Sequence, residues 1–532
     1  MMTQSLASLL VVAIACSGCT RGDGNASQGD AGSSGDAASA EGRSGDDAAR
    51  DGDAEGGGHG ADAGDAGDAG DAGGGATSTP AIRASSGWQV YDAPAGPEYH
   101  YGPSSIINAD GSIDMWTCSP GSNGAWDYVR YHRSTDGGHT WTPDVVALQP
   151  TAGSLDAYST CDPGVVVIGS YYYVGYTSTT NSAGTNNDVF LARSTSPSGP
   201  FDKWNGTGWG GNPQPILTYT GDPSSYGYGE PALVLVGKKL YVYYSDDEAT
   251  QYTNVATVDD ATVDDWPAHL VDHGHAITRT RNAQDSADVV YVDSLGLFLA
   301  VTTYERFTSN ASVAAYVSKD GLSFTPVPYF GVRAQQGAHN IGISSDPSGH
   351  FDVKAANFVA YAYQPTGDGW GQWPTFLDPI QLASSPLGTP VAGEVSSIVN
   401  GSDWNWSGPR AWDGDPTTVY SSDSHGTTAT ATEWAMVDTG ATYALSGVTL
   451  VPRAGGYGFP VDFSIQTSAD GSAWTDVPGQ SHTGFPDPTA PVVITFGAPV
   501  SARYLRINAT RLGADNLGNC YLQLAEIVPA VH

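Results

Sequence analysis

Positively charged side chains are scarce in this sequence. Its 532 residues include 21 lysines and arginines against 56 aspartates and glutamates, which gives a formal net charge of −35. Binding to a phosphate backbone needs a cluster of cations, and so few of them cannot form a basic face for nucleic acid. The same imbalance favours neutral or cationic ligands over anionic ones.

Cysteines and charged residues of either sign are also few. There are 5 cysteines, and only 14% of the residues are charged, whereas tyrosine, tryptophan and glycine number 28, 14 and 68. This composition is typical of a turn-rich all-β protein that contacts its ligands with aromatic rings. Cys118 and Cys161 can form a disulfide if neighbouring strands bring them together, but their spacing alone does not establish the pair.

The N-terminal apolar segment is too short to span a bilayer as a permanent helix. We interpret residues 1–19 as a signal peptide. Its "VAIAC" resembles a bacterial lipoprotein signal and places the lipid on Cys16, whereas "CSGC" would place it on Cys19. The alternative to a lipoprotein signal is a plain secretory signal. We expect a bacterial cell-surface or outer-membrane lipoprotein, or a secreted protein, that meets a membrane only through its lipid anchor.

Residues 20–83 consist mainly of Gly, Asp, Ala and Ser, including "DAGDAGDAGDAGGG". No apolar residue recurs there to build a core, so we predict a disordered and self-repelling tether.

Five similar strand–turn–strand units follow the tether. They include "CDPGVVVIGSYYYVGYTS" and "GEPALVLVGKKLYVYYSD". The equivalent positions recur at intervals of about 50 to 70 residues, which is the spacing of propeller blades. They fall near Gly102, Asp162, Glu230, Ser286 and His339. We therefore predict a five-bladed β-propeller over residues 84–388, in which these positions converge on the central channel.

The propeller region resembles glycoside hydrolase family 43 and its arabinanase, levansucrase and invertase relatives. The resemblance lies in the Asp-Pro strand at Asp162, in "GPF" at residues 199–201 and in the strand that begins with Glu230. It implies that Glu230 is the general acid and that Asp162 is one of two assisting aspartates. Glycoside hydrolysis needs such a pair of carboxylates. It also implies that His339 helps to hold a calcium ion or a water cluster on the axis.

Blade one departs from that family because Gly102 and Pro103 stand where relatives carry an acid. The missing carboxylate can come from "QDSADVV", as Asp288 or Asp285; without it, the propeller only binds sugar.

"STDGGHTW" is an Asp-box and "SKDGLSF" a weaker copy, and both predict hairpin turns. The Asp-box raises a sialidase as a rival, but the Arg-Ile-Pro signature of sialidases is absent.

Residues 395–532 resemble the coagulation factor 5/8 type C (discoidin) domain, which is also carbohydrate-binding module family 32. "RAWDGDPTTVYSS", "FSIQTSADGSAWTDV" and "ARYLRINATRL" carry the resemblance. It implies an eight-stranded jelly-roll sandwich. Oxygen-rich "DGDPTT" suits calcium, and the resemblance implies a structural ion on Asp413, Asp415, Thr418 and Glu526. Candidate sugar contacts in the loops are His425, Arg453, Tyr457 and Asn519.

We therefore predict an all-β glycoside hydrolase that acts on polysaccharide and is targeted by a carbohydrate-binding module. The alternative is a noncatalytic glycan-binding or adhesion protein. We expect a monomer with no organic cofactor. For the sugar-stacking platforms at the rim of the propeller, the candidates are Tyr101, Trp126, Tyr173 and Trp209.

Overall fold

The computed structural model describes residues 77–90, 99–122, 125–247, 251–278, 284–331, 334–363, 373–401 and 403–532. The predicted signal peptide, Cys16 and the predicted tether up to residue 76 lie outside this range. The described chain is almost entirely β, and its helices are four short 3₁₀ turns, η1 (Trp266–His269), η2 (Val399–Gly401), η3 (Trp404–Trp406) and η4 (Gly408–Ala411). In this described part, no helix is long and apolar enough to cross a membrane.

The first two blades are four-stranded antiparallel sheets in which strand order follows the sequence. Blade one contains β3 (Tyr101–Ile107), β4 (Ile113–Pro120), β5 (Asp127–Ser134) and β6 (Val145–Leu148). Blade two contains β7 (Cys161–Ile168), β8 (Tyr171–Ser178), β9 (Asp188–Ser194) and β10 (Asp202–Lys203).

Blades three and four repeat this plan. Blade three contains β11 (Gly227–Val236), β12 (Lys239–Asp247), β13 (Gln251–Val258) and β14 (Val271–Thr278). Blade four contains β15 (Gln284–Val292), β16 (Leu297–Tyr304), β17 (Ser312–Ser318) and β18 (Thr325–Val327).

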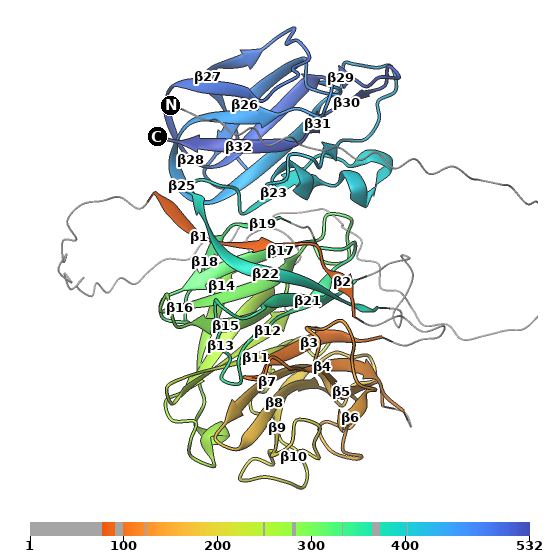
Figure 1. Ribbon diagram of the computed structural model, residues 1–532, viewed down its shortest axis with the longest axis vertical. Helices are drawn as coiled ribbons and strands as arrows, with labels where there is room; N and C mark the ends of the chain where they lie inside the picture. The colour runs from red at the N-terminus through yellow and green to blue at the C-terminus, as the bar shows by residue number, and fades with distance from the viewer. Residues whose placement is uncertain are drawn as a thin grey trace, which may run out of the picture. The chain divides into compact units, whose positions relative to one another are not determined.

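Blade five is completed by the start of the described chain. Its inner strands are β20 (His339–Ile343), β21 (Phe358–Ala362) and β22 (Thr375–Pro386). The N-terminal strands β1 (Ser78–Ala84) and β2 (Trp88–Gln89) pair with β22, and β19 (Tyr329–Gly331) then pairs with β1. Figure 1 shows the red-orange β1 running alongside the teal β22. This pairing closes the ring, as propellers must to avoid an open sheet edge, and confirms the predicted five-bladed propeller.

The predicted Asp-box turns are also present. Asp136 Oδ1 accepts the N–H groups of His139 and Thr140 at 3.1 and 2.8 Å. Asp320 makes the equivalent turn in blade four.

A segment of blade five crosses the far end of the innermost strands. The backbone N–H groups of Ile107, Val167, Leu235 and Tyr291, one in each of the other four blades, donate to carbonyl oxygens of residues 345, 347, 348 and 349. The bonds measure 2.6 to 3.0 Å. We call residues 344–351 the plug segment. Because it occupies this end of the channel, a ligand has to approach from the end where the innermost strands begin.

The C-terminal strands form a sandwich around their own core. The main sheet runs β23 (Ala392–Val395), β25 (Glu433–Val451), β28 (Val492–Arg511), β26 (Asp462–Ser468) and β27 (Thr475–His482), with β32 (Glu526–Val531) on β25. Two small pairs join β24 (Tyr420–Ser421) to β31 (Gln523–Leu524) and β29 (Gly513–Ala514) to β30 (Cys520–Tyr521). Alternating side chains such as Val437, Ile465, Leu505 and Ile507 are fully buried, as the period of a strand requires.

Candidate functional site

Every innermost strand of the propeller contains a β-bulge at the same place. The register shifts span Tyr101/Ser104, Cys161/Gly164, Gly229/Ala232, Gln284/Ala287 and His339/Gly342. Two residues per blade are therefore left out of the ladder, and a bulge re-aims side chains in this way. The bulges lie at the end of the channel opposite the plug segment.

The first bulge residue adopts a left-handed backbone in four blades. The φ angles are 56° at Gly102, 47° at Asp162, 52° at Glu230 and 47° at Asn340. This conformation is strained for residues other than glycine and is typical of functional sites. In blade five the equivalent position is therefore Asn340, one residue beyond the predicted His339. In blade four the register places Asp285 there, three residues before Asp288.

Glu230 and Asp162 lie in one pocket although they come from different blades. The pocket is also lined by Gly102, Asp288 and Asn340 and has a volume of about 30 Å³. That volume holds about two water molecules. The pocket is therefore too small to enclose a ligand much larger than water.

Glu230 is held at both carboxylate oxygens. Asn340 Nδ2 donates to Oε1 at 2.7 Å, and Ser245 Oγ donates to Oε2 at 2.5 Å. The backbone N–H of Glu230 donates to Thr177 Oγ1 at 2.7 Å. These neighbours from blades two, three and five fix the acid in one orientation. Sequence reasoning did not identify Asn340, Ser245 or Thr177, because their convergence depends on how the blades close.

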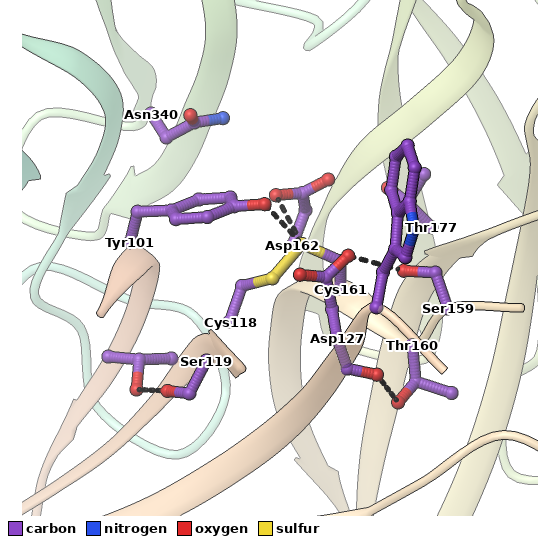
Figure 2. Close-up of a disulfide and its surroundings, with 12 residues drawn as sticks. Tyr101, Cys118, Ser119, Asp127, Ser159, Thr160, Cys161, Asp162, Thr177 and Asn340 are labelled. Atoms are coloured by element: carbon purple, nitrogen blue, oxygen red, sulfur yellow. Dashed lines mark hydrogen bonds between the residues drawn. A yellow bond between two sulfur atoms is a disulfide. The ribbon is translucent and has the colours of Figure 1, made fainter. Parts of the chain in front are cut away.

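Asp162 lies between a tyrosine and a disulfide. Tyr226 Oη donates to Asp162 Oδ2 at 3.3 Å. Cys118 and Cys161, whose pairing the sequence left open, form a disulfide that joins β4 to β7, that is, blade one to blade two. Cys161 Sγ lies 3.3 Å from Asp162 Oδ1 and 3.2 Å from the hydroxyl of Tyr101, as Figure 2 shows. A disulfide sulfur carries no proton, so these are packing contacts that fix the position of Asp162.

Blade one contributes no carboxylate at the bulge. A Cβ placed on Gly102 would lie 3.2 Å from Asp162 Oδ1. The glycine therefore lets Asp162 approach this strand more closely than a residue with a side chain would allow.

Asp288 lines the pocket but is bound to backbone. Its Oδ2 accepts the N–H of Ile343 at 2.8 Å, and its Oδ1 accepts the N–H of the next residue, Val289, at 2.9 Å. Burial raises the pKa of Asp288 to about 7, although the hydrogen bonds from these two N–H groups lower it in part. Asp288 therefore links blade four to blade five and is among the residues that line the pocket.

His339 is buried within aromatic rings. Its ring centroid lies 4.0 Å from Trp373 and 4.8 Å from Phe307. Among the described residues, one group of three His, Cys, Asp or Glu side chains has metal-ligand spacing, and it consists of Cys118, Asp127 and Cys161. Its two cysteines are bonded to each other, so this group does not offer thiolates to a metal.

The predicted calcium ligands partly converge in the sandwich. Thr418 Oγ1 and the N–H of Asp415 donate to Asp413 at 2.9 Å each, while the Asp415 carboxylate accepts the N–H of Thr417 in its own turn. Glu526 Oε1 is buried without a hydrogen-bond partner. Burial, and then the nearby Asp413, raise the pKa of Glu526 to about 9; burial also raises that of Asp413 to about 6. Two buried acids that repel each other fit a bound cation.

The predicted sugar contacts lie on neighbouring loops of the sandwich. Arg453 donates to Gln523 at 2.9 Å, and its guanidinium lies 5.0 Å from the ring centroid of Trp406 and 5.8 Å from that of Tyr457. Sequence reasoning missed Trp406, which η3 presents beside the arginine. His425 contacts Glu433 at 2.8 Å.

The remaining candidate, Asn519, lies on a loop next to that of His425. Its backbone N–H donates to Asp515 at 2.8 Å. The N–H of His425 donates to the carbonyl of Cys520 at 3.0 Å, which holds the two loops together.

Comparisons with known proteins give several solved structures with low similarity. A family 117 glycoside hydrolase, Zg3597 from Zobellia galactanivorans, is 14% identical over 57% of this chain and 90% of its own, with a TM-score of 0.43. A thermostable family 43 glycoside hydrolase is 14% identical over 56% of this chain and 96% of its own, with a TM-score of 0.41. Chitosan-binding module 1 of a Paenibacillus sp. IK-5 chitosanase/glucanase is 26% identical over 27% of this chain and 95% of its own, with a TM-score of 0.22.

No curated protein matches this chain. One family model does, over residues 394–527, and this part of the chain is an F5/8 type C domain.

Proposed function

We propose that this chain is a secreted or surface-anchored glycoside hydrolase that acts on polysaccharide, with the F5/8 type C domain keeping it on glycan. The observation that carries the proposal is the convergence of Glu230 and Asp162, from different blades, in one pocket at the open end of the channel. Strained left-handed backbone at both residues supports it, because such strain persists mainly where function requires the geometry.

In the proposed reaction Glu230 protonates the leaving glycosidic oxygen. Asn340 and Ser245 hold its carboxyl group toward the pocket. Asp162, fixed by Tyr226 and the disulfide, orients the sugar or activates the attacking water. Asp288 is the third acid of the proposal. Two carboxyl groups with different environments can supply one acid and one base in this way.

The test is release of reducing sugar from arabinan, xylan, galactan and aryl glycosides by the purified chain. We expect Glu230→Gln and Asp162→Asn each to lower kcat by at least about 100-fold, the usual size of a general acid–base contribution. Asp202→Asn, an exposed acid on the outermost strand β10, is the matched control and should leave kcat unchanged. Full activity in Glu230→Gln would contradict the assignment.

A second function, noncatalytic glycan binding or adhesion, is favoured by one observation, the absence of an acid at Gly102. It predicts retained binding to one of these polysaccharides without release of sugar from any of them.

The sandwich completes the proposal with a structural calcium ion held by Asp413, Asp415, Thr418 and Glu526. A bound calcium would neutralise the two buried carboxylates. Location at the bacterial surface, through a lipid on Cys16, is part of the same proposal.

A further inference from the structure

Exposed aromatic rings are rare on the propeller. Trp126 is 47% exposed, more than any other aromatic residue of the described propeller, and Phe307 follows at 39%. The other candidate platforms are unavailable, since Tyr101 and Tyr173 are 9% and 4% exposed. The guanidinium of Arg193 lies 4.2 Å from the ring centroid of Trp209 and occupies its face. Trp126 is therefore the one predicted platform whose ring is open to solvent.

Trp126 is anchored by its backbone and packed against the chain, although its ring is exposed. Its backbone N–H donates to the carbonyl of Tyr158 at 2.9 Å, and its own carbonyl accepts the N–H of Gly121 at 2.6 Å. A Cβ on Gly184 would lie 2.8 Å from the indole, so this glycine lets the chain pack directly against the ring. Rigid aromatic surface loses little entropy when a ligand covers it.

Contacts connect this ring to the acid pocket on two sides. Asn187 Nδ2 donates to the carbonyls of Gly184 and Tyr226 at 2.9 and 2.7 Å, and the Tyr226 hydroxyl reaches Asp162. Asp127, the residue after Trp126, has a carboxylate oxygen within 4.8 Å of Cys161 Sγ. Trp126 does not line the pocket itself, but two short series of contacts connect it to Asp162, which does.

We propose that Trp126 is the stacking platform for a neutral sugar unit of the polysaccharide, bound beside Asp162 at the mouth of the pocket. The inference rests on the proposed function. The pocket is too small for a sugar, so binding energy must come from its rim. The part of its lining that the structure describes contains acids and no lysine or arginine, which disfavours uronic acids. An indole offers an apolar face to the C–H side of a neutral ring.

The test measures binding of arabino-, xylo- and galacto-oligosaccharides by calorimetry to the full chain carrying Glu230→Gln, so that nothing is turned over. Tyr457→Ala is added to silence the aromatic contact of the sandwich. In this background Trp126→Ala should weaken the best ligand by about tenfold, a typical effect of losing an aromatic contact. Trp126→Phe should keep affinity within about threefold. Val271→Ala, which removes an exposed apolar side chain from β14, should change nothing.

A second readout is the fluorescence of the tryptophans. Bound oligosaccharide should protect tryptophan emission from quenching by acrylamide, and the protection should vanish in Trp126→Ala. Unchanged affinity in Trp126→Ala, or galacturonan oligomers binding as tightly as neutral ones, would overturn the inference while loss of hydrolysis in Glu230→Gln still stood. Failure of every glycan to bind or be cleaved would instead overturn the proposed function.

Discussion

Single carboxylates in this molecule are shaped more by burial than by ion pairs. Asp162 and Glu230 accept hydrogen bonds from hydroxyl and amide donors, and among the described residues that line their pocket there is no lysine or arginine. Hydrogen bonds to neutral groups hold a carboxylate in place without neutralising it.

Asp188 should make the free energy of unfolding depend on pH. Burial raises its pKa to about 6, although the N–H of Tyr219, which donates to it at 2.7 Å, lowers the pKa in part. An acid with a raised folded pKa contributes stability that is present below its unfolded pKa and lost as pH rises to about 6. Asp188→Asn keeps the acceptor, so the fall in unfolding free energy between about pH 4 and 6 should shrink by on the order of 1 kcal/mol. Urea denaturation at several pH values measures it; an unchanged slope would contradict it.

The acids of the sandwich give a different prediction. Calcium should raise the melting temperature of the F5/8 type C domain, and a chelator should lower it. A ligand present at a concentration of 100 times its Kd raises the free energy of unfolding by about 2.7 kcal/mol. Because the pKa of Glu526 is raised to about 9, calcium must displace a proton, and binding should strengthen as pH rises toward that value. Asp413→Asn should abolish the calcium response seen by calorimetry, and the exposed Asp487→Asn should retain it.

At the scale of elements, the disulfide between β4 and β7 supports the site. It encloses 43 residues of sequence and joins two blades beside Asp162. Loop-closure entropy predicts that the Cys118→Ala, Cys161→Ala double variant loses about 4 kcal/mol of unfolding free energy. Denaturant titration measures the loss. Because Asp162 follows Cys161 directly, kcat should fall as well, and a variant with full kcat would show that the bulge alone positions the acid.

The repeated strands were predictable and the bulges were not. Unbroken apolar runs such as Val165–Ile168 and Ala232–Val236 identify buried strands wherever they occur, so blade spacing could be read from the sequence. A bulge forms where two residues leave the strand pairing. His339 stays paired and Asn340 does not, and nothing in the local sequence distinguishes the two. The neighbours of Glu230 come from three blades, and no local pattern specifies such distant partners.

At the scale of the whole molecule, the ring depends on its first strand. Ile82 of β1 is fully buried in the core between blades four and five. Ile82→Ala should cost about 2 to 5 kcal/mol through the cavity it leaves, whereas Ser78→Ala on the same strand should cost almost nothing. Urea unfolding followed by tryptophan emission compares the two. Equal stability would show that β1 contributes little to closure.

The position of β1 was also hidden in the sequence. Its "STPAIRA" continues from the Gly- and Asp-rich segment without an obvious boundary, and its partner β22 lies almost 300 residues later. Pairing between strands so far apart is set by the closure of the ring and not by local propensity.

The closing strand also determines how the propeller would carry mechanical load. The chain enters the propeller at Ser78, so tension applied to its N-terminal side while glycan is held at the pocket would act first on the hydrogen bonds between β1 and β22. Those hydrogen bonds close the ring of blades. Under shear flow, the strength of attachment would then be limited first by the pairing of β1 with β22.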